Sequence, residues 1–150
     1  MLANIALIYA EAGQYLDESY FPDAKRNIDE AISVFEERIG PLKEHGAIGI
    51  TLMSNKALIY DIIGNSDDAI LTLKDIVNSF ANDPDVSEAW MLAVNNLATI
   101  YMKQNKWADG AKLLEKIKSN NNDFNYIMSQ NLTLCYLYQK NYVKAIKSLS

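Results

Sequence analysis

The residues that could support catalysis or bind a metal are few in this sequence. The chain has one cysteine, Cys135, and one histidine, His45, which lie 90 positions apart. A nucleophilic thiol needs a base within hydrogen-bonding reach, and nothing in the pattern brings these two together. We therefore interpret Cys135 as a small core residue. One cysteine and one histidine also exclude a thiolate-rich zinc site and a multi-histidine metal centre.

The paired carboxylates of Asp67 and Asp68 are the other group that could suggest chemistry. They follow Ser66 directly, and we expect Ser66, Asp67 and Asp68 to cap a helix and to place negative charge at its positive end. The sequence contains no glycine-rich phosphate loop. We therefore expect no catalytic residue, no bound metal and no cofactor, and hence no enzyme.

An asparagine that recurs in four similar segments is more informative. The segments are 4–9, 55–60, 96–101 and 131–136, and each begins with Asn and ends with Tyr. In the last three, a small residue follows the tyrosine after nine positions (Ala69, Gly110 and Ala145). This constant spacing indicates internal repeats. An asparagine side chain carries a donor and an acceptor together, which matches the N–H and C=O groups of a peptide main chain.

The composition predicts the elements that must position these residues. Six glycines and three prolines in 150 residues leave few turn formers, which favours long helices joined by short connections.

No stretch approaches 18 uninterrupted apolar residues, so we expect no membrane insertion. The net charge of −5 argues against nucleic-acid binding. A lone cysteine does not require an oxidising compartment, and the expected localisation is cytoplasmic.

The four segments resemble the tetratricopeptide repeat (TPR), a 34-residue helix–turn–helix unit. In the unit that contains the third segment, Leu97, Ala98, Tyr101, Gly110 and Leu114 match the family's preferred residue types. The resemblance implies an all-α, right-handed α-solenoid of about four repeats, which looks like a segment of a longer array. We expect one domain over 1–150, with repeats at approximately 1–49, 50–90, 91–125 and 126–150.

The pattern departs from the plain family in its spacing. The recurring asparagines are 51, 41 and 35 residues apart. The stretch 83–98 is similar to one junction of the 42-residue repeat of kinesin light chains. The first repeat carries extra residues at 16–28, including Asp17, Glu18 and Tyr20. These extra residues form either a second interaction surface or a loop that simply docks on the solenoid.

Three further positions carry local expectations. Gly13 and Gly64 each follow a repeat tyrosine by four residues, which predicts that each ends its helix in the left-handed conformation. Lys56 stands where the resemblance implies an aliphatic residue. We expect its stem to pass the edge of the core and its ammonium to reach water.

The resemblance also implies where a partner would bind, because the first helices of TPR units line a concave groove that the recurring asparagine faces. The expected groove residues are Asn4, Ser54, Asn55, Asn95, Asn96, Thr99, Gln130, Asn131 and Tyr138. The alternative is that these asparagines bond to a neighbouring repeat and only stabilise stacking. The groove lacks the basic residues of the family's carboxylate clamp, so a receptor for chaperone C-termini is not expected.

The predicted function is a protein–protein interaction scaffold that binds a partner peptide or helix in the groove. One alternative is a structural subunit that uses its convex face and uncapped ends, with end-to-end self-association; another is a peptide-sensing regulator. Residues 101–150 carry three acidic and eight basic side chains, against sixteen acidic and six basic in 1–100. Lys112, Lys116 and Lys144 could therefore form a second surface, or they are simply solvated.

Overall fold

The computed structural model describes residues 1–117 and 122–149, and within these ranges it contains eight α-helices and no strand. The helices are α1 (Leu2–Tyr15), α2 (Phe21–Arg38), α3 (Gly46–Ile62), α4 (Ser66–Ser79), α5 (Ser87–Lys103), α6 (Trp107–Leu114), α7 (Asn122–Tyr138) and α8 (Tyr142–Lys147). Short 3-10 segments precede three of them: η1 (Glu18–Tyr20), η2 (Leu42–Glu44) and η3 (Pro84–Val86). The all-α expectation is confirmed. No helix in the described ranges is both long and apolar enough to span a membrane.

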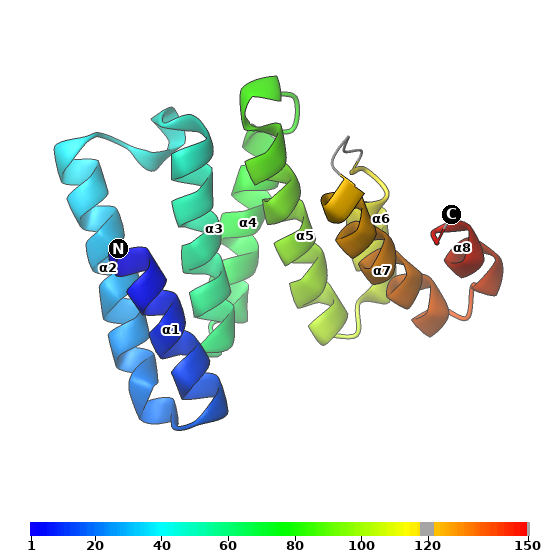
Figure 1. Ribbon diagram of the computed structural model, residues 1–150, viewed down its shortest axis with the longest axis horizontal. Helices are drawn as coiled ribbons and strands as arrows, with labels where there is room; N and C mark the ends of the chain where they lie inside the picture. The colour runs from blue at the N-terminus through cyan, green and yellow to red at the C-terminus, as the bar shows by residue number, and fades with distance from the viewer. Residues whose placement is uncertain (118–121, 150) are drawn as a thin grey trace. The chain divides into compact units, whose positions relative to one another are not determined.

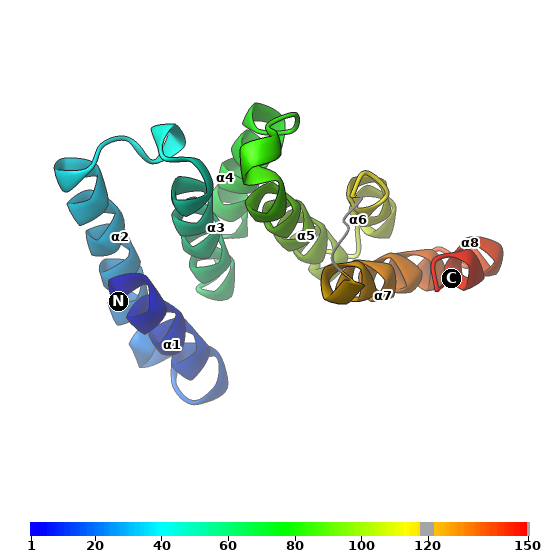
Figure 2. The ribbon, with the colours of Figure 1, turned by 45° about the horizontal axis from the view of Figure 1, so that its top comes forward.

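The helices pack in chain order within two compact units, residues 1–93 and 94–150. In the first unit α1 packs against α2 and α3 against α4, and both α1 and α2 contact α3. The α1–α2 pair lies side by side in both views (Figures 1 and 2). In the second unit α7 packs against both α6 and α8. Short connections leave the helices of these contacting pairs next to each other.

Small residues occupy the helix contacts in both cores. In the first unit Ala6, Ala10, Ala24 and Ile28 are fully buried against one another and against Ile59 of α3. In the second unit the cluster has the same character, and its buried members are Ala98, Ala111, Leu114, Met128, Cys135, Tyr136 and Ala145. Alanine on one helix leaves room for a large side chain of the next, so the helices pack closely.

One turn recurs at the ends of α3, α5 and α7. Four residues after the repeat tyrosine, Gly64, Asn105 and Lys140 have φ values of 93°, 60° and 59°. The amide of the following residue donates to the tyrosine carbonyl in all three turns, at 2.7–2.8 Å. This is the left-handed helix ending that the position of Gly64 predicts.

Two local expectations are wrong. Gly13 lies inside α1 rather than at its end, and the ring of Phe21 occupies the space where a side chain at this position would stand. The N-cap of α4 is Asn65 without a side-chain hydrogen bond, while the Ser66 hydroxyl donates to Asp61 at 2.7 Å. Asp67 and Asp68 lie in the first turn of α4, where the helix dipole favours negative charge.

Candidate functional site

Two of the recurring asparagines, Asn4 of α1 and Asn55 of α3, line one pocket in the first unit. The pocket has a volume of about 380 Å³. Asn4 is exposed and Asn55 is half-buried, and neither amide has a hydrogen-bond partner within the described residues. The exposed side chain of Ile48 and the half-buried Leu52 add apolar surface beside them. The pocket therefore offers amide donors and acceptors next to an apolar wall.

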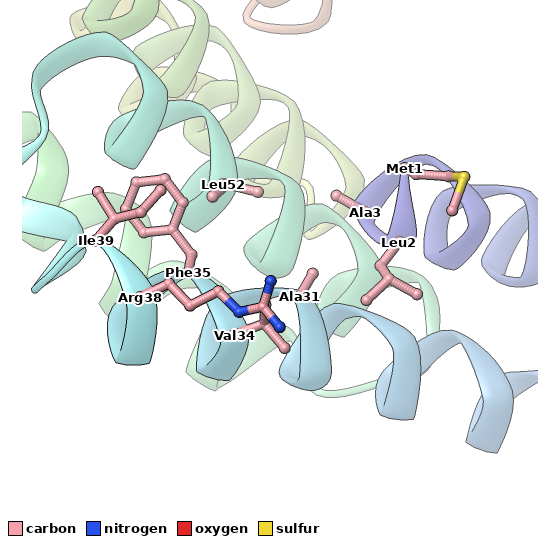
Figure 3. Close-up of a pocket in the computed structure, with 9 residues that line it drawn as sticks. All are labelled: Met1, Leu2, Ala3, Ala31, Val34, Phe35, Arg38, Ile39 and Leu52. Atoms are coloured by element: carbon pink, nitrogen blue, oxygen red, sulfur yellow. The ribbon is translucent and has the colours of Figure 1, made fainter.

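A second pocket of about 370 Å³ adjoins the first and shares Met1, Ala3 and Leu52 with it. Its remaining lining, shown in Figure 3, comes from the first turn of α1, from the C-terminal half of α2 and from Ile39 directly after it, and includes Val34 and Phe35. Arg38 contributes the only charged side chain of this lining. The two pockets together form an apolar recess with polar groups at its edges, the usual character of a binding site.

Ser54, expected in the groove, is buried instead. Its exposed fraction is 5%, and its hydroxyl has no hydrogen-bond partner within the described residues. One residue along α3 is 100° around the helix, so Ser54 is turned toward the core while Asn55 lines the pocket. Thr51, one turn before Asn55, is exposed in the same pocket, and its hydroxyl donates to the carbonyl of Ala47 at 2.8 Å.

The asparagines of the second unit are arranged differently. The amide of Asn131 on α7 donates to the side-chain oxygen of Asn95 on α5 at 2.8 Å. Thr99 is half-buried and donates to the backbone carbonyl of Asn95 at 3.0 Å. Asn96 is half-buried and Gln130 is exposed. The Asn131–Asn95 bond joins neighbouring helices, as the stacking alternative requires.

Tyr138, expected as a groove contact, stacks on Trp107 at the start of α6. The ring centroids lie 4.0 Å apart and the planes differ by 5°. Tyr138 remains 63% exposed. The pair therefore presents a flat aromatic surface to solvent at this end of α7.

A charged cluster that sequence reasoning did not anticipate joins α2 to α3. The Tyr60 hydroxyl donates to both carboxylate oxygens of Asp29, and the Lys56 ammonium lies 3.1 Å from the same group. Burial alone would lower the pKa of Lys56, but Asp29 raises it above the ordinary value. Burial and Asp29 together raise the pKa of Tyr60. The ammonium of Lys56 is therefore paired with a carboxylate rather than directed only to water.

A similar cluster of a tyrosine, a carboxylate and a lysine occurs in the second unit. The Tyr136 hydroxyl donates to Glu115, and Lys144 lies 3.4 Å from the same carboxylate. Burial and the Glu115 bond raise the pKa of Tyr136 to about 12. The bond from Tyr136 in turn lowers the pKa of Glu115, with help from Lys144. Both clusters join helices at the repeat tyrosine, so we assign them a structural role.

The extra residues of the first repeat fall into two groups. Asp17 and Glu18 are exposed and line a pocket of about 520 Å³ where the α1–α2 turn approaches the end of α3. We call this the turn pocket, and its lining consists of Gly13, Gln14, Tyr15, Leu16, Asp17, Glu18, Phe21, Ile62, Ile63 and Gly64. Tyr20 lies outside it and stacks on Tyr9 at 6.2 Å between ring centroids.

The lysines expected as a second surface also differ among themselves. Lys112 and Lys116 are exposed, whereas the ammonium of Lys144 pairs with Glu115 and lies 5.2 Å from the centre of the Tyr136 ring.

The described parts of the chain contain no group of three or more His, Cys, Asp or Glu side chains placed to bind a metal ion.

Comparison with known proteins identifies the fold to which this helical arrangement corresponds. No protein-family model and no curated protein sequence matches the chain. Two crystal structures of TPR-like repeats from a predicted kinesin light chain of Podosopora anserina are similar to it. One of them, a variant with a single substitution, has a TM-score of 0.74 at 16% identity, covering 99% of this chain and 69% of that one. The other has a TM-score of 0.74 at 15% identity, covering 99% and 70%. This chain therefore has the fold of TPR-like repeats, of the kind found in that kinesin light chain.

Proposed function

We propose that this protein is an interaction scaffold that holds an extended segment of a partner protein in the adjoining pockets of its first unit. The observation that carries the proposal is the shared pocket of Asn4 and Asn55, whose amides have no partner within the described residues. Two amides on adjacent first helices can bond to the main chain of a bound segment. The neighbouring apolar recess would accept a side chain of that segment.

Hydrogen bonds from the two asparagines would orient the main chain of the bound segment. The apolar recess would determine which side chains of that segment are preferred. Amide contacts to a peptide main chain are independent of its sequence, whereas Val34, Phe35 and Leu52 offer an apolar surface of defined shape. The second unit contributes less to this proposal, because the Asn131 amide already bonds to Asn95.

Replacement of both pocket asparagines tests the proposal. Immobilised wild-type protein and an Asn4→Ala, Asn55→Ala variant are used to capture partners from native lysate, and the affinity of each purified partner is then measured. The matched control is Asn78→Ala, Asn82→Ala, which removes two exposed amides from the same unit. Loss of two main-chain bonds should weaken binding by at least about tenfold. Binding that survives the pocket variant, or is weakened equally by the control, would contradict the proposal.

A specific surface favours a second candidate, the structural subunit of a larger assembly. The last described helices expose many large apolar side chains: Leu134, Leu137, Tyr138, Tyr142, Val143, Ile146 and Leu149. Val143 and Ile146 are 67% and 69% exposed. Apolar surfaces of this kind commonly mark protein contacts. A Val143→Asp, Ile146→Asp variant that loses captured partners, while the asparagine variant keeps them, would favour this second function.

A further inference from the structure

We propose that the turn pocket binds a lysine or arginine side chain from a basic segment of a partner protein. The pocket lies where the α1–α2 turn meets the end of α3, and it combines an apolar lining with carboxylates and helix ends. Its chemistry matches a side chain that has an aliphatic stem and a cationic head.

The apolar part of the pocket suits the stem. Phe21, Ile62 and Ile63 are half-buried and line the pocket, so apolar surface remains available to a guest. Tyr15 and Leu16 are more exposed to solvent, at 77% and 79%. The Tyr15 ring also offers an aromatic face, to which a cation is attracted.

The charged part of the pocket suits the cationic head. Asp17 and Glu18 are exposed, and neither carboxylate forms an ion pair with a described residue. The side chain of Asp17 accepts a bond from the Ser19 amide at 2.9 Å, which holds one carboxylate in place. Carboxylates held beside an apolar lining favour a cationic guest over an anionic or neutral one.

Two helix ends add negative potential at the same place. α1 ends at Tyr15 and α3 ends at Ile62, and residues of both last turns line the pocket. The amides of Leu16 and Asp17 both donate to the carbonyl of Ala12, so they do not bond to the later carbonyls of α1. Carbonyls at a helix C-terminus stabilise a nearby cation.

The charge of the whole unit acts in the same direction. Residues 1–93 contain sixteen acidic and six basic side chains, a net charge of −10. A field of this sign raises the rate at which a basic segment reaches the surface. The turn pocket lies at the C-terminal end of α1, whereas Asn4 lies in the first turn of this helix. The turn pocket is therefore independent of the pocket that Asn4 and Asn55 line.

Nuclear magnetic resonance titration of the isotope-labelled chain tests the proposal with small probes. The probes are N-acetyl-arginine amide and N-acetyl-lysine amide, and the neutral control is N-acetyl-norleucine amide. Both cationic probes are expected to shift the backbone amides of Gly13, Asp17 and Gly64, whereas the norleucine compound is not. The shifts should also weaken as salt is added, because salt screens exposed charges.

Two matched variants distinguish binding by the pocket carboxylates from attraction by the net negative charge of the whole unit. Asp17→Asn, Glu18→Gln keeps shape and the Ser19 contact, and should weaken probe binding about fivefold to tenfold, as expected for two exposed ion pairs. Glu30→Gln, Glu37→Gln makes the same charge change at exposed positions on α2 and should leave binding within about twofold. Thermal melts of both variants verify that they are folded.

Several outcomes would overturn the proposal. Absence of shifts at the pocket amides, equal shifts from the norleucine compound, or equal weakening by both variants would each do so. Shifts that appear with rising protein concentration and no probe would assign the pocket to a second copy of the chain. The Asn4→Ala, Asn55→Ala variant should retain probe binding, so failure of the proposed function and failure of this site are distinguishable.

Discussion

The phenol of Tyr60 donates to both oxygens of Asp29, at 3.0 and 3.2 Å, and so joins α3 to α2 through a charged acceptor. The phenol of Tyr136 likewise donates to one carboxylate oxygen of Glu115 and so joins α7 to the end of α6. The repeat tyrosine therefore does more than fill space in the core. In these two repeats the hydroxyl joins the repeat to the second helix of the repeat before it.

Replacement of this phenol should loosen the first unit. We expect Tyr60→Phe to lower the free energy of unfolding by about 1 kcal/mol, because a partly exposed bond to a carboxylate is lost. Urea unfolding followed by circular dichroism measures the change. Tyr15→Phe serves as the control, since Tyr15 is 77% exposed, and should change stability little.

The same cluster predicts a dependence on alkaline pH. The pKa values of both Tyr60 and Lys56 are raised in the folded state, so their stabilising contribution is complete below pH about 10 and declines above it. Stability of the wild-type chain should therefore fall more steeply above that pH than stability of Tyr60→Phe. Parallel slopes would show that the cluster contributes no proton-linked stability.

Ser54→Ala should stabilise the protein. The Ser54 hydroxyl is buried without a hydrogen-bond partner in the described parts of the chain, and alanine is also the better helix former. We expect a gain of about 1 kcal/mol in the free energy of unfolding, measured by urea denaturation. Ser33→Ala, at an exposed site on α2, isolates the contribution of helix propensity alone. A loss of stability would mean that the hydroxyl has a partner in solution.

Gly49→Ala should strongly destabilise the first unit. A Cβ atom at this position would overlap the carbonyl oxygen of Leu42, which belongs to the backbone of η2 and has little room to move. We expect a loss of about 3 kcal/mol, read from the thermal midpoint and the urea midpoint. Asn78→Ala, on the exposed side of α4, is the control and should stay within about 0.5 kcal/mol of wild type.

Cys135 should react slowly while the protein is folded. Burial raises the pKa of its thiol to about 11, so little thiolate exists at pH about 8. Modification by a thiol reagent should be roughly a hundredfold slower in the native protein than in urea. Because the folded pKa is the higher one, the contribution of Cys135 to stability should decline from pH about 8.5 toward about 11. Cys135→Ala should lack the part of the decline below pH about 10, where Tyr60 and Lys56 do not yet contribute. Equal native and denatured rates would show that the thiol is open to solvent.

Much of the fold follows from local pattern. The nine-residue interval between each repeat tyrosine and the next small residue predicts a helix, a tight turn and a second helix, because these elements have fixed lengths and fixed geometry. Ala98 and Ala111 are buried where that pattern expects close contact between helices. The turn after Tyr60 ends in a left-handed residue, as the glycine at position 64 indicates.

The site depends on contacts that local pattern does not specify. Asn55 and Asn131 occupy equivalent positions in their segments, yet Asn55 lines a pocket whereas Asn131 bonds to Asn95. The difference arises because the third repeat presents Asn95 beside α7. Which side chains approach each other depends on how neighbouring helices pack, and equivalent sequence positions need not have equivalent neighbours.

Residue type and spacing along the chain were enough to predict the helical repeats and their small-residue contacts, because each of these depends on the geometry of one helix and its nearest neighbour. Three other features became visible only in the packed molecule: Ser54 is buried, Phe21 covers Gly13, and Asp17 and Glu18 border a pocket. These features depend on contacts between side chains of separate elements. The spacing of residues within one helix does not determine which side chains of another element it will contact.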